Sequence, residues 1–158
     1  MTENPQEFYS NPEKTPPLIP AVIIENDSDI IHILKDWLED SDFTTVGVAK
    51  NRKEADKLVD QLKDLGNPVV FLDGNLSDEK DEDGNRWTYA DGKELSKKIT
   101  DTDPGVNIII VGISRNNEPL KHMINFEINK SLLRGTADIP EFNKIREGWS
   151  RLQERAQG

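Results

Sequence analysis

The sequence predicts a doubly wound α/β fold, in which helices cover both faces of a parallel β-sheet. Short, continuous apolar runs are typical of strands that are buried on both faces. These runs alternate along the chain with longer segments whose apolar residues recur at helical spacing. Strands and helices that alternate in this way form parallel sheets with right-handed crossovers. The length of 158 residues fits one such domain.

The first strand is expected at residues 21–24, where four apolar residues follow one another. It ends at Glu25, and Asp27 or Ser28 can cap the next helix. A second strand is expected at 44–48, before an amphipathic helix that Gly66 can end. The apolar stripes of these two helices are Ile30, Ile31, Leu34, Trp37 and Leu38, and then Ala55, Leu58, Val59, Leu62 and Leu65.

The third strand is expected at 68–72 and ends at Asp73. An acidic insert at about 77–90 separates it from a helix at about 91–100. Two more strands are expected at 106–113 and 126–128. The last helix carries the apolar stripe Ile139, Phe142, Ile145, Trp149 and Leu152.

Residues 1–19 are expected to be a disordered tail because they are rich in proline and polar residues. The folded domain is therefore expected at 20–155. The net charge of −10 argues against nucleic-acid and anionic-membrane partners, and no apolar run is long enough to cross a bilayer. The absence of cysteine excludes disulfides and thiol chemistry. The sequence thus predicts a cytoplasmic protein.

Polar side chains follow four of the five expected strands. Because the carboxyl ends of parallel strands meet at one edge of a sheet, we expect these side chains to gather there. Carboxylate and amide oxygens suit Mg²⁺, a lysine and a hydroxyl suit phosphoryl oxygens, and a carboxylate can accept a phosphoryl group. The sequence therefore predicts a magnesium-assisted aspartyl-phosphate site, built from Glu25, Asn26, Asp73, Asn75, Ser114 and Lys130.

From Ala21 to about Gln153 the chain resembles the receiver domain of two-component response regulators, in a somewhat atypical form. Five segments carry the resemblance: 22–27, 69–76, 91–95, 110–114 and 128–130. The resemblance implies a five-stranded sheet in the flavodoxin-like order 2-1-3-4-5. It also implies signalling by a shift between two conformations.

The resemblance assigns a role to each site residue. Asp73 would accept the phosphoryl group from a phosphohistidine, carried by a sensor histidine kinase or a histidine phosphotransfer protein. Ser114 and Lys130 would contact that group. Glu25, Asn26, the Asp73 carboxylate and the Asn75 backbone carbonyl would hold Mg²⁺. The expected protein is a stand-alone receiver or phosphorelay protein, with a downstream protein partner and at most self-phosphorylation and self-dephosphorylation as activity.

Several positions depart from the family pattern. Asn26 stands where an acid is usual, Ser131 where a proline is usual, and Glu127 where an aromatic residue is common. The helix near 118–124 is expected to be short. These departures motivate one alternative, a pseudo-receiver that acts as an interaction module without phosphorylation.

The other alternative is a phosphohydrolase of the haloacid dehalogenase type, which also uses a strand-end aspartate and a lysine. Those enzymes need a second aspartate where this chain has Asn75, and acidic metal ligands for which only Asp138 and Glu141 are available. A calcium loop in the acidic insert fails as well, because Ala90 stands where a bidentate glutamate is required.

Overall fold

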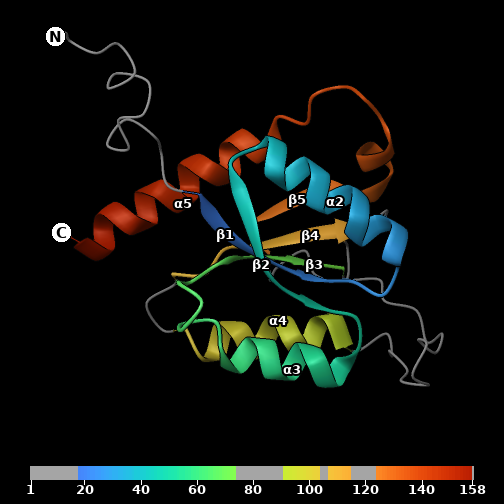
Figure 1. Cartoon of the computed structure of the whole chain (residues 1–158). Coiled ribbons are helices and arrows are strands. Elements are labelled where there is room, and N and C mark those ends of the chain that lie inside the picture. The colour runs from blue at the N-terminus through green and yellow to red at the C-terminus, as the bar shows by residue number, and fades with distance from the viewer. Residues whose placement is uncertain (1–17, 74–90, 104–106, 115–123, 158) are drawn as a thin grey trace, which may run out of the picture.

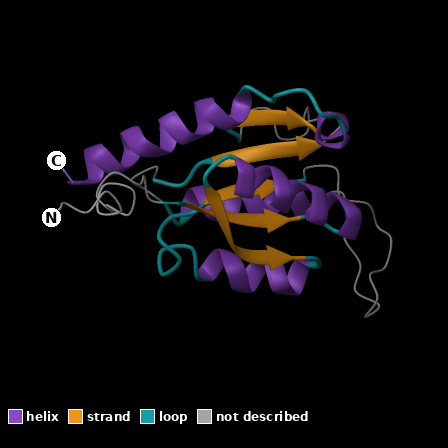
Figure 2. Cartoon of the chain, turned by 45° about the horizontal axis from the view of Figure 1, so that its top comes forward, coloured by secondary structure: helices purple, strands orange, loops and turns teal. Residues whose placement is uncertain are grey.

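The computed structural model describes residues 18–73, 91–103, 107–114 and 124–157. Its strands form one five-stranded parallel sheet in the order β2-β1-β3-β4-β5, which confirms the predicted topology (Figure 1). The arrowheads in Figure 2 all point the same way, so the carboxyl ends of the strands lie at one edge. The strands are β1 (Ile19–Ile24), β2 (Phe43–Ala49), β3 (Val69–Leu72), β4 (Ile110–Ser114) and β5 (Phe126–Asn129).

Helices cover both faces of the sheet, as predicted. The helices α2 and α5 lie on one face, and α3 and α4 lie on the other (Figure 1). None of the helices among the described residues has both the length and the apolar character that a bilayer crossing needs. Their bounds are α2 (Ser28–Asp40), α3 (Arg52–Asp60), α4 (Asp91–Asp101), the short 3₁₀ helix η3 (Lys130–Arg134) and α5 (Glu141–Gln157).

Two apolar clusters, one on each face, hold the layers together. Successive side chains of a strand point to opposite faces. Accordingly, Ala21 and Ile23 of β1 belong to the cluster under α2 and α5, whereas Val22 and Ile24 belong to the cluster under α3 and α4. Burial on both faces explains why this strand is a continuous apolar run in the sequence.

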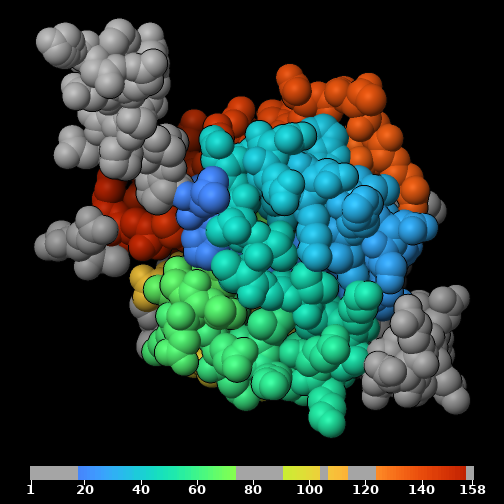
Figure 3. Space-filling view, in the orientation of Figure 1, coloured from blue at the N-terminus to red at the C-terminus, as the bar shows by residue number. Residues whose placement is uncertain are grey.

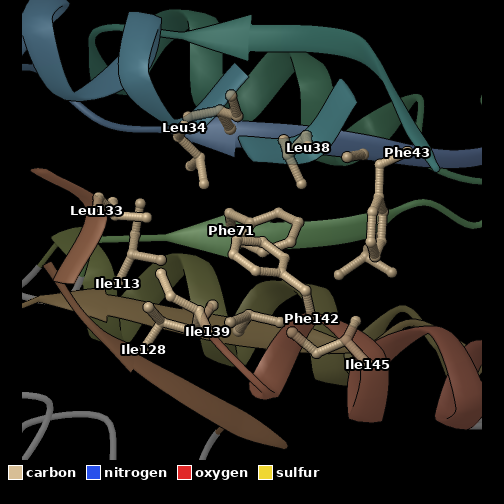
Figure 4. Packing of buried hydrophobic residues seen from close by; sticks show 14 of the residues in the cluster. Leu34, Leu38, Phe43, Phe71, Ile113, Ile128, Leu133, Ile139, Phe142 and Ile145 are labelled. Atoms are coloured by element: carbon tan, nitrogen blue, oxygen red, sulfur yellow. The ribbon is translucent and has the colours of Figure 1, made fainter. Parts of the chain in front are cut away.

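Aromatic rings fill the centre of the cluster under α2 and α5 (Figure 4). Phe43, Phe71 and Phe142 form a triangle of rings, with centroid distances of 6.1 Å from Phe43 to Phe71 and 6.3 Å from Phe142 to each of the others. Trp37 of α2 stacks on Phe142 of α5 at 5.8 Å, with 9° between the ring planes. Such pairs stabilise a core beyond the area that they bury.

The edge strand β2 contains a bulge. The register with β1 shifts by one residue, so that Ala21 faces Thr45 and Val22 faces Gly47, while Val46 has no partner and is exposed. Figure 3 shows this edge in view at the front of the molecule, between α2 and the α3 region. The bulge limits pairing of this edge with another chain.

Some strands and helices begin or end at other residues than the sequence predicts. The strand β1 begins at Ile19, a residue expected in the tail, because Ile19 is buried and donates its backbone N–H to Asp42 O. Pro20 is compatible with this strand since pairing with β3 begins only at Ala21, so the missing N–H costs no bond. At the other end, α5 extends to Gln157.

Two internal boundaries also differ. The helix α3 ends at Asp60, and turns lead from there to Gly66, whose φ of 88° suits glycine. The strand β4 begins at Ile110 rather than near 106. Near this start, side chains accept the backbone hydrogen bonds that a neighbouring strand would otherwise accept. Asp103 Oδ2 accepts the Ile108 N–H, and Asn125 Oδ1 accepts the Ile110 N–H. The expectations for residues 1–17, the acidic insert and the segment 118–123 lie outside the described residues.

Candidate functional site

Two carboxylates lie at the carboxyl edge of the sheet, directly after neighbouring strands. Glu25 follows β1 and donates its backbone N–H to Ala49 O, and Asp73 follows β3 and donates its own to Ile24 O. Each acid thus continues the hydrogen-bonding ladder of its strand by one residue. Glu25 is 0% exposed and Asp73 is 1% exposed. Both acids are therefore held by the backbone and shielded from solvent.

The Lys130 ammonium joins the two acids. Lys130 comes directly after β5, and its Nζ lies 2.7 Å from Asp73 Oδ2 and 2.5 Å from Glu25 Oε1. Its side chain is 19% exposed. Three of the residues predicted from the sequence, on three different strand ends, are thus brought together in one cluster.

The charges in this cluster do not balance. Burial, together with the charge of Asp73, raises the pKa of Glu25 from 4.5 to about 8, and Lys130 offsets only part of this. Burial lowers the pKa of Lys130, but the charges of Glu25 and Asp73 outweigh it, so that this pKa is raised overall. Two carboxylates against one ammonium leave the metal-free site short of positive charge.

The donor set fits a hard divalent cation. Glu25 Oε2 accepts the backbone N–H of Asn26 at 2.8 Å, and Oε1 is paired with the Lys130 ammonium at 2.5 Å. Two neighbouring carboxylates at one edge of the sheet supply the anionic oxygens that Mg²⁺ prefers as ligands. Among the described residues, no group of three acids or histidines could hold a metal by itself.

For the other predicted site residues, the structure gives mainly a position in the chain or the sheet. Asn26 directly follows Glu25 and is half-buried. Ser114 is the last residue of β4 and pairs in register with Asn129, which puts its backbone at the same edge of the sheet. Asn75 lies outside the described residues. Asp27 is the N-cap of α2, because its Oδ1 accepts the Asp29 and Ile30 N–H groups.

Sequence reasoning missed an ion cluster between α3 and α4. Arg52 lies 2.5 Å from the Asp91 carboxylate and 2.7 Å from that of Glu94, and it also pairs with Asp56 at 3.2 Å. Asp91 is buried. The pairing joins the first turns of the two helices, at the same edge as the site. No local signal could have found it, because Arg52 and Asp91 are 39 residues apart.

A cavity of about 520 Å³ lies at the opposite, amino edge of the sheet. Ile19, Asp42, Arg146 and Trp149 are among the residues that line it. Ile19 begins β1 and Asp42 precedes β2, so this cavity is separated from the acids by the length of the strands. It contains none of the predicted site residues.

Solved structures share this fold, although no family model and no curated protein matches the sequence. A receiver domain from Methylobacillus flagellatus has a TM-score of 0.58 and 18% identity, and the match covers 84% of this chain and 98% of that one. The receiver domain of a modulated diguanylate cyclase from Desulfovibrio desulfuricans G20 has a TM-score of 0.59 and 17% identity, over 87% and 98%.

A plant protein gives the same result. The receiver domain of the histidine kinase CKI1 from Arabidopsis thaliana matches with a TM-score of 0.56 and 18% identity, over 84% of this chain and 90% of that one. Over most of its length, this chain therefore has the fold of response regulator receiver domains, as the resemblance in sequence implied.

Proposed function

We propose that this protein with a receiver fold accepts a phosphoryl group on Asp73 from a phosphohistidine partner, with Mg²⁺ as cofactor. The observation that carries the proposal is the position of Asp73. Its carboxylate lies at the carboxyl edge of the sheet, 2.7 Å from the Lys130 ammonium and beside the buried Glu25. A carboxylate with a cation and a second acid is the arrangement that an acyl phosphate site requires.

The transfer exchanges one bond to phosphorus for another. An Asp73 carboxylate oxygen attacks the phosphorus atom, the new O–P bond forms, and the P–N bond breaks with its electron pair going to the imidazole nitrogen of the donor. The Lys130 ammonium, which pairs with Asp73 beforehand, can then pair with a phosphoryl oxygen. Ser114, at the end of β4, is the proposed hydroxyl donor to another oxygen.

Charge explains why this reaction needs a divalent cation. Phosphorylation replaces the single negative charge of the Asp73 carboxylate with about two on the acyl phosphate, in a site where Glu25 is a second acid and Lys130 the one ammonium in contact with both. Glu25, Asn26, Asp73 and the Asn75 carbonyl are the proposed ligands, and Mg²⁺ would neutralise the oxygens that carry this charge.

Incubation with acetyl phosphate tests the proposal. With Mg²⁺ present, intact mass spectrometry should show the addition of one phosphoryl group, and EDTA should abolish it. Asp73→Asn should remove the addition, whereas Asp101→Asn, which changes an exposed carboxylate of α4, should retain it. Beryllium fluoride with Mg²⁺ should shift the amide resonances of Ser114 and Lys130.

The pseudo-receiver alternative rests on one observation of its own. Lys130 contacts both acids, so each carboxylate has a cationic partner in the absence of a metal or a phosphoryl group. If neither a mass gain nor a resonance shift appears, the protein is an interaction module with the same fold. The haloacid dehalogenase alternative has little support, since Asp138 is exposed and belongs to no metal-ligating group among the described residues.

A further inference from the structure

The short helix η3 links the site lysine to the apolar core. Lys130 is its first residue, and Leu133 follows one turn later. A 3₁₀ helix has three residues per turn, so side chains three apart lie on the same face. In η3 this face points into the domain, because Lys130 contacts Glu25 and Asp73 while Leu133 is 1% exposed in the core (Figure 4). Rotation of η3 would therefore move both side chains together.

Contacts at both ends hold η3 in this rotation. At its start, Asn129 Oδ1 accepts the Ser131 backbone N–H at 3.0 Å and the Ser131 hydroxyl at 2.7 Å. Near its end, the indole N–H of Trp37 donates to the Leu133 carbonyl oxygen at 2.8 Å. The Trp37 ring is itself fixed, since it stacks on Phe142 of α5.

We propose that Trp37 is a positioning residue for Lys130. Its hydrogen bond to the Leu133 carbonyl fixes the rotation of η3 and keeps the ammonium beside Asp73. The residue after the lysine is a serine, whose φ is not restricted by a ring as that of proline is, so the backbone depends on contacts from outside the segment. The effect on phosphoryl transfer rests on the function proposed above, but the placement of the lysine does not.

The variant Trp37→Phe tests this role. It retains an aromatic ring against Phe142 and removes the N–H donor together with part of the indole ring. The readout is the rate at which an amine-acylating reagent labels Lys130, measured by peptide mass spectrometry relative to the exposed Lys53 of the same molecules. Loss of one hydrogen bond should increase the relative labelling of Lys130 about fivefold. The phosphorylation of Asp73 by acetyl phosphate should slow by a similar factor.

The matched control is Trp149→Phe. The indole of Trp149 also donates to a backbone carbonyl, that of Asn67, but it lies on α5 near the amino edge of the sheet. This variant should leave the relative labelling of Lys130 unchanged. A general loss of stability would increase the labelling of Lys130 in both variants, whereas a positioning role of Trp37 would increase it only in Trp37→Phe.

A second variant covers the case in which Trp37→Phe does not fold. Asn129→Ala removes the contact at the start of η3 from an exposed position, and it should also increase the labelling of Lys130. If Lys130 is labelled at the wild-type rate in folded Trp37→Phe, the positioning role is refuted. Where Trp37→Phe does not fold, the wild-type rate in Asn129→Ala refutes it, because the rotation of η3 then does not control Lys130. If labelling rises but wild-type Asp73 accepts no phosphoryl group, the positioning role stands and the proposed function fails.

Discussion

At the scale of single residues, Lys130 stands at the centre of the candidate site, because both buried acids contact its ammonium. Glu25 and Asp73 lie in an environment that penalises charge, and the ammonium offsets only part of that penalty. Removing one partner of a buried ion pair leaves the other charge uncompensated. Removing this lysine should therefore affect folding whether or not the proposed phosphoryl transfer takes place.

We expect Lys130→Met to lower the free energy of unfolding by roughly 3 kcal/mol at pH 8, because the two acids then lie buried without a cation. Urea denaturation measures this change. The control is Lys97→Met, which removes a lysine paired with Asp101 on the exposed face of α4 and should change stability little. Equal effects of the two substitutions would contradict the importance of the buried cluster.

The raised pKa of Glu25 predicts a pH dependence of stability in the metal-free protein. Since the pKa is about 8 in the folded state and 4.5 for an unperturbed side chain, the folded state binds more protons between these values. The contribution of Glu25 to the free energy of unfolding should therefore fall as the pH rises from about 4.5 to about 8, and level off above.

Urea denaturation across this pH range, with EDTA present, checks the prediction. The variant Glu25→Gln cannot ionise, so its stability should rise relative to the wild type as the pH increases. Parallel curves for the two proteins would show that Glu25 titrates normally.

At the scale of the elements, side chains cap the starts of α2 and α3. Asp27 caps α2, and Asn51 caps α3 through its Oδ1, which accepts the Glu54 N–H at 2.8 Å. Glu54 in turn accepts the Lys50 N–H, at 2.8 Å. Such caps satisfy N–H groups that the helix itself cannot pair.

The Arg52 cluster should couple α3 to α4. We expect Arg52→Met to lower the free energy of unfolding by about 1–2 kcal/mol, because it removes one cation that pairs with three acids, of which Asp91 is buried. Denaturant unfolding gives the magnitude, and hydrogen exchange at the start of α4 should accelerate. The control Arg151→Met removes an exposed pair within α5 and should leave both measurements near the wild type.

For the whole molecule, the proposed metal site links ligand binding to folding. A cation that binds only the folded state stabilises it by mass action, by about 1.4 kcal/mol at a concentration tenfold above its Kd. Mg²⁺ should therefore raise the thermal unfolding midpoint, measured against EDTA. Glu25→Gln should abolish the increase, and Asp101→Asn should retain it. An increase that persists in Glu25→Gln would place the cation elsewhere.

The sequence by itself determined the layers and much of the site. Continuous apolar runs occur because the central strands are buried on both faces, and helical stripes occur because each helix has one buried face. Parallel strands have their carboxyl ends at one edge, which is why Glu25, Asp73 and Lys130 could be assigned to one site before any distance was known.

Only the tertiary structure decided the contacts between distant segments. Trp37 and Leu133 are 96 residues apart, so no local pattern reveals that an indole of α2 holds the helix that carries the lysine. The start of β4 depends in the same way on a distant residue. Asn125 Oδ1 accepts a hydrogen bond from the backbone N–H of Ile110, which lies 15 residues earlier in the chain. The spacing of apolar residues indicates which face of a helix or strand is buried. The hydrogen-bond partner of each polar group depends instead on how the whole chain packs.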